Sequence, residues 1–423
     1  MMICELIIYL MKYRIAIITY LVYACLHLMR TAFPFVQYNI AQYYGTDEKY
    51  IGILAAATYI IMGIGYLFRN LFLPRRIVHS YFIEGSLCAI FYLLIPISML
   101  FNFKSLVFGV ICYGLYGLFQ SGLFVTLTTL MGQHFSSEKD GTLLGFWSST
   151  SDFGNIAGYF ISTIIIYYIH ASFEWPLIIA SILTLIITFV MKIGIPEPQI
   201  FEQREKSVKK CFGEIADYFK QTDNALYALI ILFLGAGQYG ILLWLPMYLQ
   251  ENKYEDFQGY ISMTYSACNL IGGTIIGSCF QLTAKRRRHF LAVFLALCFG
   301  ILALSLIYVF RITPEHKWYL LFLVGCLGLS IGGSFNVYTG IEMIKQQYES
   351  ENTLITGNII NGFINFMIGI LQFILGIISS EDSHSIFIVF IIVTGISAIF
   401  VLIRLVVTRD SSKRPLHEIE ELE

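Results

Sequence analysis

Charged residues are scarce in this sequence of 423 residues. Asp, Glu, Lys and Arg together make up 13% of the chain, whereas 57% of it is hydrophobic and its mean hydropathy is +0.71. A soluble protein of this length needs a charged and polar coat, and these residues are too few to supply one. The composition therefore excludes an ordinary soluble fold. It indicates a polytopic membrane protein, in which each span needs about 20 mostly apolar residues.

Several motifs of enzyme chemistry are also missing. The sequence has no GxxxxGK[ST] loop for a nucleotide phosphate, no GxSxG and no HExxH. Its nine cysteines are scattered without a CxxC pair, and buried cysteine usually acts as a small hydrophobe. We therefore expect no enzymatic activity, no cofactor, no metal site and no nucleic-acid partner.

Apolar segments long enough to span a bilayer fill most of the chain. We predict twelve of them, at roughly 14–40, 50–73, 77–101, 105–132, 140–168, 174–195, 223–249, 257–282, 289–311, 317–345, 354–379 and 385–407. The longest polar interruption follows the sixth segment. The sequence thus predicts an all-α membrane protein with two six-helix bundles, at 1–195 and 223–408, a central loop at 196–222 and a tail at 409–423.

Basic residues gather on one predicted side of the membrane. That side holds the start of the chain, the connections after the second, fourth and eighth segments, the central loop and the tail. By the positive-inside rule, both termini and the central loop face the cytosol. The short start shows no small-residue cleavage site, so we expect no removable signal peptide. We expect a monomer whose partners are the lipid bilayer and a small solute.

One arginine lies well inside the first predicted span, in "YACLHLMRTAF". Tyr23, His27 and Arg30 are spaced at i, i+4 and i+7, which places them on one face of a helix. A charge at this depth costs several kcal/mol and usually points into the bundle, where it marks a substrate or ion route. The alternative is that Arg30 pairs permanently with an intramembrane acid and only ties helices together.

Three acids lie within predicted spans and are possible partners of Arg30. Glu84 is interpreted as a structural tie, and Glu342 lies near the end of its span. Asp152, in "GFWSSTSDFGNIAG", lies deeper. It is either the resting partner of Arg30, displaced when an anion arrives, or a carboxylate that carries a proton.

Side-chain amides are frequent in the second half of the chain. Gln238 lies in the seventh segment, Asn269 in the eighth and Asn336 in the tenth, while the eleventh carries a row of four: Asn358, Asn361, Asn365 and Gln372. Amides both donate and accept hydrogen bonds, so a group of them suits hydroxyl groups or phosphate oxygens. Interhelical hydrogen bonding is the competing interpretation, at about 0.6 kcal/mol per bond.

Several of these segments resemble those of a known family. "YACLHLMRT" is similar to a Y-x-x-x-H-x-x-R-K element in its first helix, and "HFSSEKDGTLLGFWSSTSDFGN" to a W-F-x-x-x-x-R-G-x-x-x-G-x-W-N-x-x-x-x-x-G-N stretch. "QYGILLWLPMYL" is similar to Y-x-x-x-x-W-x-P-x-Y, and "GGSFNVYTG" to a turn of the tenth helix. The chain thus resembles major facilitator transporters, in particular the organophosphate:phosphate antiporters and the sugar-phosphate exchangers of solute carrier family 37.

This resemblance implies exchange of a phosphorylated sugar or glycerol phosphate for inorganic phosphate by alternating access, in the endoplasmic reticulum or another intracellular membrane. Arg30 would grip the phosphoryl group, because a guanidinium matches phosphate oxygens with two parallel hydrogen bonds. The full predicted substrate site, from residues and resemblance together, is Arg30, His27, Tyr23, Trp147, Asp152, Gln238, Tyr239, Asn336, Asn361 and Asn365.

The sequence departs from the family pattern around this site. Thr31 stands where the family has a base after the arginine, Gln238 where one branch has a second arginine, and Ser148 where it has Asn, while Asp152 is an added acid. With one cation fewer and one anion more, a site that includes Asp152 is near neutral. Two alternatives to phosphate exchange therefore stay open: a proton-coupled symporter of an organic anion or neutral solute, and a non-transporting receptor or scaffold.

Overall fold

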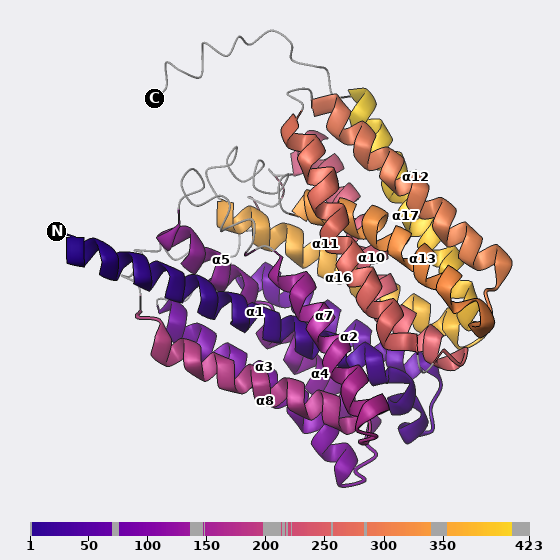
Figure 1. Cartoon of the computed structure of the whole chain (residues 1–423), viewed down its shortest axis with the longest axis horizontal. Helices are drawn as coiled ribbons and strands as arrows, with labels where there is room; N and C mark the ends of the chain where they lie inside the picture. Colours follow the sequence, from indigo (N-terminus) through magenta and orange to yellow (C-terminus); the bar gives the residue numbers. More distant parts are fainter. Residues whose placement is uncertain are drawn as a thin grey trace.

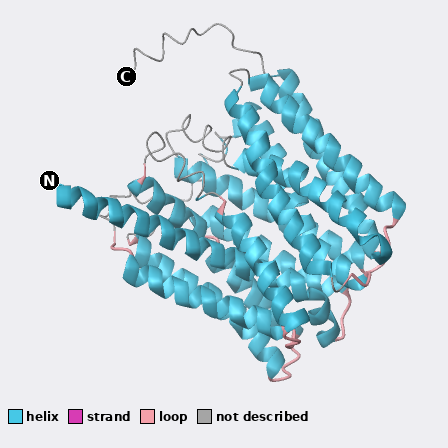
Figure 2. Ribbon diagram, viewed as in Figure 1, coloured by secondary structure: helices cyan, strands magenta, loops and turns pink. Residues whose placement is uncertain are grey.

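The computed structural model describes residues 2–69, 76–135, 147, 149–197, 213, 216, 219–220, 222–254, 257–282, 286–339 and 353–407. Within these ranges the chain is almost entirely helical and has no strand (Figure 2). The tail, most of the predicted central loop, Ser148 and Glu342 lie outside the described residues.

Two groups of helices follow one another along the chain. The first, called here the N-terminal half, contains α1 (Met2–Tyr44), α2 (Glu48–Arg69), α3 (Ile77–Leu100), α4 (Leu106–Gln120), α5 (Leu123–His134), α7 (Thr150–Thr163), the π-helix η1 (Ile164–Tyr168) and α8 (Glu174–Gly194). In Figure 1 these helices, coloured indigo to magenta, occupy the lower left of the molecule.

The second group, called here the C-terminal half, occupies the upper right of Figure 1 in orange to yellow. It contains α10 (Thr222–Glu251), α11 (Gln258–Leu282), α12 (Arg286–Phe310), η3 (Pro314–His316), α13 (Lys317–Leu327), η4 (Gly328–Gly332), α14 (Gly333–Val337), α16 (Thr353–Ser379), η6 (Ser383–Ser385) and α17 (Ile386–Val407). The exact domain boundaries, at 195 and 223, stay a prediction.

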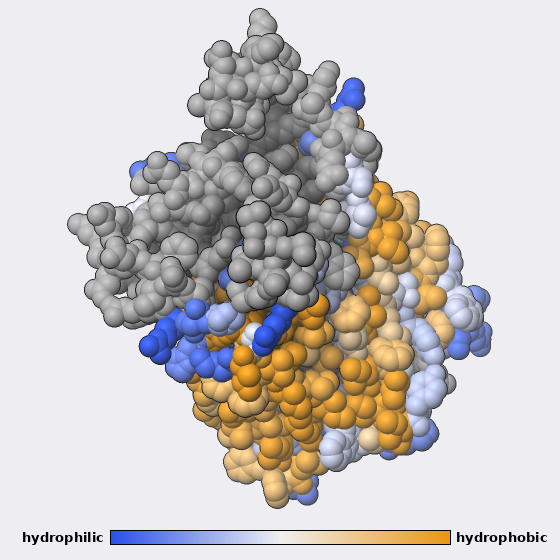
Figure 3. All heavy atoms as spheres, turned by 60° about the vertical axis from the view of Figure 1, so that its left-hand side comes forward, coloured by the Kyte–Doolittle hydropathy of each residue, from blue (hydrophilic) through white to orange (hydrophobic). Residues whose placement is uncertain are grey.

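Ten helical segments of the described chain are long and apolar enough to cross a membrane. Large apolar side chains face outward on them, among them Ile17, Phe189 and Val309, which are 58%, 55% and 69% exposed. Figure 3 shows a broad hydrophobic face with hydrophilic residues toward its edges. The chain is therefore a multi-pass integral membrane protein.

The predicted spans at 140–168 and 257–282 are helices too, but they are not among those ten. The first corresponds to α7 and η1, whose described part begins at Thr150 and carries Asp152 and Asn155. The second is α11, where Asn269 and several Ser, Thr and Gly residues dilute the apolar ones. These two helices pack against each other across the halves, and Asp152, Asn155 and Asn269 are each at most 4% exposed, so these three are sheltered from lipid.

Small residues bring the two halves together along α2 and α16. A Cβ atom added at Gly52 would lie 2.8 Å from the Cα atom of Gly376, and one added at Gly63 would lie 2.8 Å from the carbonyl oxygen of Gly362. Such distances are too short for any side chain, so glycine permits the backbones to touch. This close packing is the usual way in which membrane helices associate, since lipid is as apolar as leucine.

Hydrogen bonds join the halves at the end of the molecule where α1 ends and α2 begins. Gln37 donates to the carbonyl oxygen of Leu243 at 2.8 Å, and the Tyr159 hydroxyl donates to that of Leu242 at 2.9 Å. Further bonds of this kind link Gln250 with Asn39 and Gln258 with Phe35. The described structure is thus closed at this end.

We expect Gly52→Ala to lower the thermal stability of the purified protein, because the added methyl group must push α2 and α16 apart. Overpacking of this kind typically costs about 1–3 kcal/mol. Gly395→Ala is the matched control, since nothing lies within 4 Å of a Cβ added there. Melting curves in detergent measure both changes, and equal melting temperatures for the two variants would contradict the close α2–α16 contact.

Candidate functional site

Arg30 reaches from α1 to the opposite half of the molecule. Its Nη1 atom donates a hydrogen bond of 3.2 Å to the Tyr239 hydroxyl on α10. The guanidinium carbon also lies 5.4 Å from the centre of the Tyr239 ring, within the range of a cation–π interaction. The guanidinium Nε atom has no hydrogen-bond partner among the described residues. Arg30 therefore keeps unused donor capacity while it bridges the two halves.

A small cavity adjoins Arg30, lined by tyrosines of the N-terminal half. Its volume is about 20 Å³, which suits roughly one water molecule. Tyr59 comes from α2, Tyr92 from α3, and Tyr113 and Tyr116 from α4, and each is at most 3% exposed. The Tyr113 hydroxyl completes no hydrogen bond within the described chain. The surroundings of Arg30 are therefore neutral hydroxyl groups, which we call the tyrosine cage.

His27 and Tyr23 lie on the same helix as Arg30, as predicted, but they face their own half. The His27 Nδ1 atom lies 3.3 Å from the Asn155 side-chain oxygen on α7, and its ring centre is 4.7 Å from that of Tyr23. Tyr23 stacks in turn on Trp147 at 6.0 Å. Tyr23 thus links His27 and Trp147 into one aromatic group on the buried face of α1, next to Arg30.

Asp152 does not pair with Arg30 in this structure. The carboxylate is 2% exposed, and its oxygens accept from two amides of the C-terminal half, Asn269 at 2.9 Å and Asn336 at 3.0 Å. The interpretation of Asp152 as the resting partner of Arg30 is therefore wrong for this conformation. The two charged residues bridge the halves at separate contacts.

The predicted amide residues do not form one cluster. Asn336 joins Asp152, whereas Gln238 accepts a hydrogen bond from the Tyr265 hydroxyl within the C-terminal half. Asn361 and Asn365 each donate to the carbonyl oxygen four residues earlier on α16, at 2.9 and 2.7 Å. Each therefore donates one of its two amide N–H groups to its own helix, and the predicted row toward a substrate is not assembled here.

The sequence interpretation missed the residues that surround Arg30. None of the tyrosines of the cage was predicted, and Asn155, which meets His27, was not singled out either. A signal was present in "YGLYGLFQ", where Tyr113, Tyr116 and Gln120 recur at i, i+3 and i+7 on one helix face. All three line the cavity.

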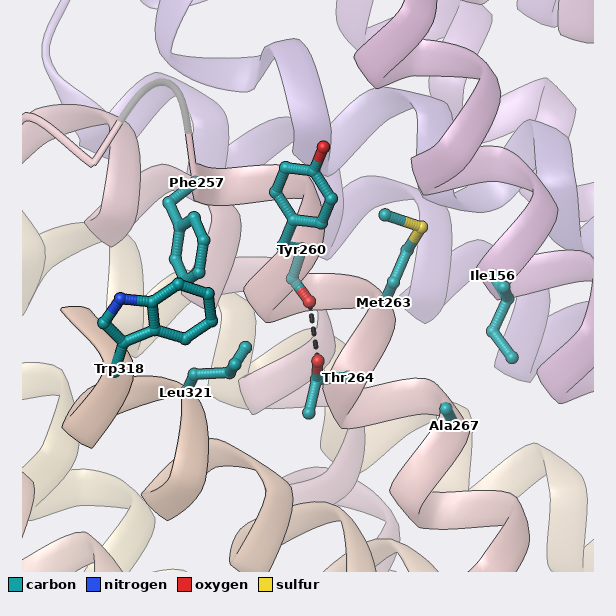
Figure 4. A pocket seen from close by; sticks show the side chains of 8 residues that line it. All are labelled: Ile156, Phe257, Tyr260, Met263, Thr264, Ala267, Trp318 and Leu321. Atoms are coloured by element: carbon teal, nitrogen blue, oxygen red, sulfur yellow. Dashed lines mark hydrogen bonds between the residues drawn. The ribbon is translucent and has the colours of Figure 1, made fainter.

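A larger cavity lies on the flank of the molecule and has a different character. It measures about 530 Å³, and its walls come from Ile156 of α7, Met263 of α11 and Trp318 of α13. Figure 4 shows these mostly apolar side chains around it, with Thr264 bonded to the backbone of its own helix at 2.8 Å. Since it offers no charged group, it is not suited to an anionic solute.

Comparison with known proteins identifies the family. The model of the Major Facilitator Superfamily matches residues 19–339, about three quarters of the chain. The chain belongs to the Major Facilitator Superfamily. The matched region includes Arg30, Asp152, Tyr239 and Asn336, so the contacts of Arg30 and Asp152 with the C-terminal half lie within it.

Curated relatives are similar at modest identity. Sugar phosphate exchanger 3 of Xenopus laevis is 23% identical over 325 residues, which cover 64% of this chain and 63% of that protein. The cis,cis-muconate transport protein of Acinetobacter baylyi is 27% identical over 257 residues, covering 57% and 58%. Putative glycerol-3-phosphate transporter 1 of Arabidopsis thaliana is 21% identical over 210 residues, covering 42% and 40%. The chain thus matches less than two thirds of the length of each relative, and the predicted resemblance to sugar-phosphate exchangers is confirmed.

Solved structures confirm the major facilitator fold. A bacterial homolog of the human lysosomal transporter Spinster, inward-facing and unoccupied, superposes with a TM-score of 0.72 at 12% identity, covering 96% of this chain and 99% of that one. The nucleoside transporter NupG gives 0.67 at 13% identity, covering 94% and 100%. At such identities the likeness concerns the fold alone.

Two other arginines in the described spanning helices of this superfamily member are paired with acids. Arg69 of α2 contacts Glu84 of α3 at 2.5 Å, with side chains only 12% and 17% exposed. Arg404 of α17, fully buried, holds Asp223 of α10 with bonds of 2.9 and 3.1 Å. The first pair confirms the interpretation of Glu84 as a structural tie. Each pair lies within a single half, the first in the N-terminal half and the second in the C-terminal half, whereas the contacts of Arg30 and Asp152 cross between the halves.

We expect Glu84→Ala to destabilise the protein by about 3–5 kcal/mol, because it leaves the Arg69 guanidinium buried without its partner. Lys49→Ala removes an exposed pair with Asp47, whose side chains are 51% and 52% exposed, and it leaves the Asp47 carboxylate that accepts from the backbone N–H of residue 49, so it should change stability little. Thermal melting of both variants measures the difference. A Glu84 variant as stable as the Lys49 variant would show that the buried pair does not hold α2 to α3.

Proposed function

We propose that this protein is a membrane transporter that exchanges a phosphorylated sugar or glycerol phosphate for inorganic phosphate by alternating access. The observation that carries the proposal is the environment of Arg30. Among the described residues it forms no ion pair, whereas Arg69 and Arg404 do, and its contacts are phenol groups. A buried guanidinium without a carboxylate partner is an unfilled binding site for an anion.

The position of Arg30 also gives the site a mechanical role. Its hydrogen bond to Tyr239 joins α1 to α10, so an arriving phosphoryl oxygen competes with the Tyr239 hydroxyl for the guanidinium. Loss of this bond loosens the N-terminal half from the C-terminal half. The cavity of about 20 Å³ is too small for a sugar phosphate, so the described conformation must widen there before a substrate enters.

Two named relatives support an organophosphate as the substrate. Sugar phosphate exchanger 3 and putative glycerol-3-phosphate transporter 1 are similar to this chain at 23% and 21% identity. A guanidinium binds phosphate oxygens through two parallel donors, and the hydroxyls of the tyrosine cage supply further donors for the remaining oxygens. In this proposal Tyr23, His27 and Trp147 hold α1 in place, and Asn361 and Asn365 turn toward the substrate only in another conformation.

A small organic carboxylate is the second candidate substrate. It is favoured by the presence of a single unpaired cation near neutral hydroxyls, which balances one negative charge better than two. The similarity to a cis,cis-muconate transport protein also points to a carboxylate substrate, although muconate itself carries two carboxylates. A carboxylate matches the guanidinium fork as well as phosphate does.

The proposal includes the setting of the protein. We place both termini and the central loop on the cytosolic side, since Lys and Arg concentrate there in the sequence. We further propose a monomer in an intracellular membrane. Its fold contains two halves around one site, so no second subunit is needed for alternating access.

The proposal is tested by uptake of radiolabelled phosphate into liposomes that contain the purified protein. The liposomes are preloaded with phosphate, glucose 6-phosphate, glycerol 3-phosphate, muconate or buffer alone. We expect uptake that depends on an internal phosphate compound. Labelled muconate is tested in parallel. Uptake of muconate and none of phosphate would favour the second candidate, and uptake of neither label under any loading would contradict transport of both classes.

We expect Arg30→Ala to lower this exchange at least about tenfold, because a hydrogen bond to a charged group contributes about 1.5–3 kcal/mol. Arg30→Lys should restore only part of it, since lysine keeps the charge but loses the planar fork. Arg311→Ala is the matched control, because this arginine is 70% exposed at the surface. Normal exchange by Arg30→Ala would show that Arg30 is not part of the substrate site.

A further inference from the structure

The larger cavity on the flank of the molecule opens toward lipid. It measures about 530 Å³ and runs between α7 of the N-terminal half and α11 and α13 of the C-terminal half; we call it the flank groove. Within one turn of its lining residues, these helices point large apolar side chains outward: Phe160, Ile271 and Phe322 are 53%, 50% and 65% exposed. Exposed apolar side chains on spanning helices face hydrocarbon. The flank groove therefore opens into the bilayer, where lipid chains are the molecules available to fill it.

One face of α11 forms the long wall of the flank groove. Tyr260, Met263, Thr264 and Ala267 recur at i, i+3, i+4 and i+7, so they follow one another along the helix, and the last two are small. The Thr264 hydroxyl donates to the carbonyl oxygen of Tyr260 at 2.8 Å, so its polar group is satisfied within α11. Thr264 and Ala267 thus leave a hollow that suits hydrocarbon better than a polar solute.

The flank groove has about the length of one leaflet of a bilayer. Figure 4 shows Phe257 and Trp318 at one of its ends and Ile156 and Ala267 at the other. Ten residues separate Phe257 from Ala267, which corresponds to about 15 Å along a helix. The hydrocarbon core of a bilayer is about 30 Å thick, so the groove spans about half of it. This length suits one acyl chain of a lipid that lies in a single leaflet.

Aromatic rings and a lysine mark the end of the groove at the membrane surface. The Phe257 ring lies 4.8 Å from that of Trp318 and 5.4 Å from that of Tyr260, and Trp and Tyr favour the membrane–water interface. Lys317, the first residue of α13, places its ammonium nitrogen 4.9 Å from the centre of the Phe257 ring. It forms no ion pair among the described residues. A positive charge therefore lies at the mouth of an apolar groove.

We infer that the flank groove binds one acyl chain of a phospholipid whose phosphate group lies at Lys317. The chain fills the apolar groove, and the head group stays outside it, which agrees with a lining that has no charged residue. Ile156 belongs to one half and the α11 wall to the other, so the bound chain touches both. Beside it, the hydroxyls of Tyr168 on η1 and Tyr260 on α11 lie 2.9 Å apart across the same boundary. This site is separate from Arg30 and requires no transported solute.

Native mass spectrometry of the purified full chain in detergent tests the inference. The probes are dioleoyl phosphatidylglycerol and dioleoylglycerol, which has the same chains but no phosphate. We expect one phosphatidylglycerol to be retained per protein, and about fivefold less dioleoylglycerol, because only the first has an anion for Lys317. Equal retention of the two lipids would contradict the phosphate contact. A protein that retains neither, or one that appears as a dimer in place of the lipid complex, would overturn the inference.

Glycerol 3-phosphate separates a lipid head group from a free phosphate compound. It carries the phosphate without a chain, so we expect that it does not displace the retained phosphatidylglycerol. Displacement would show that the flank site binds a free phosphate compound instead of a lipid. Since retention is measured without transport, a failure of this inference leaves the proposed exchange untouched, and a protein that exchanges nothing can still retain the lipid.

The variant Ala267→Leu fills the groove and tests where the lipid chain lies. The added side chain occupies the hollow on α11, so we expect phosphatidylglycerol retention to fall about tenfold. Gly395→Leu on α17 is the matched control, because nothing lies within 4 Å of a Cβ added there and α17 does not line the groove. Equal retention by the two variants would show that the lipid lies elsewhere on the surface.

The variant Lys317→Gln tests the head-group contact and remains informative if Ala267→Leu does not fold. It should lower retention of phosphatidylglycerol about fivefold and leave that of dioleoylglycerol unchanged, so the preference between the two lipids disappears. Lys104→Gln is the matched control, because Lys104 also lies over an aromatic ring, 4.8 Å from the centre of Tyr43, but away from the groove. A preference that persists in Lys317→Gln would overturn the assignment of the phosphate to Lys317.

Discussion

The cost of a charged side chain among apolar helices governs the arrangement of this molecule. Arg404 and Arg69 offset that cost by forming ion pairs within their own halves, with Asp223 and Glu84 respectively. Arg30 forms no such pair: it contacts phenol groups, and its Nε atom has no hydrogen-bond partner in the described chain. A charge that is retained in a membrane without a counter-ion is one that an incoming solute can use.

Arg30 and Asp152, which form no ion pair among the described residues, also join the halves in the interior. Arg30 joins α1 to α10, and Asp152 joins α7 to α11 and α14. Elsewhere the halves touch through glycine backbones of α2 and α16, and through backbone acceptors such as the carbonyl oxygen of Leu243. In the proposed function, an anion that binds Arg30 would therefore act on the interface between the halves, which alternating access requires to open.

The sequence predicts well whatever depends on local pattern. Hydropathy locates the spans, and helical spacing places Tyr23, His27 and Arg30 along one helix; the fold and the family resemblance are confirmed. The prediction that Glu84 is a structural tie is also correct, since Glu84 pairs with Arg69.

Contacts between distant segments are not visible in that pattern. The tyrosine cage takes side chains from α2, α3 and α4, and no local spacing brings those helices together. Asp152 was matched with Arg30 because opposite charges attract, yet α11 and α14 place two amides closer to it. Asn361 and Asn365 look like a row of donors in the sequence, but each donates from its side chain to the backbone carbonyl oxygen one turn back on its own helix. The choice between such partners depends on tertiary packing.

The most direct test of the central claim is the thermal stability of purified wild-type protein and of Arg30→Gln, measured with increasing glucose 6-phosphate, glycerol 3-phosphate, phosphate and muconate. A ligand that binds only the folded state raises the melting temperature in proportion to the logarithm of its concentration above Kd. The account predicts such a rise for wild type with at least one of these anions, and none for Arg30→Gln. An equal rise in both proteins would show that the anion binds elsewhere and would contradict the account.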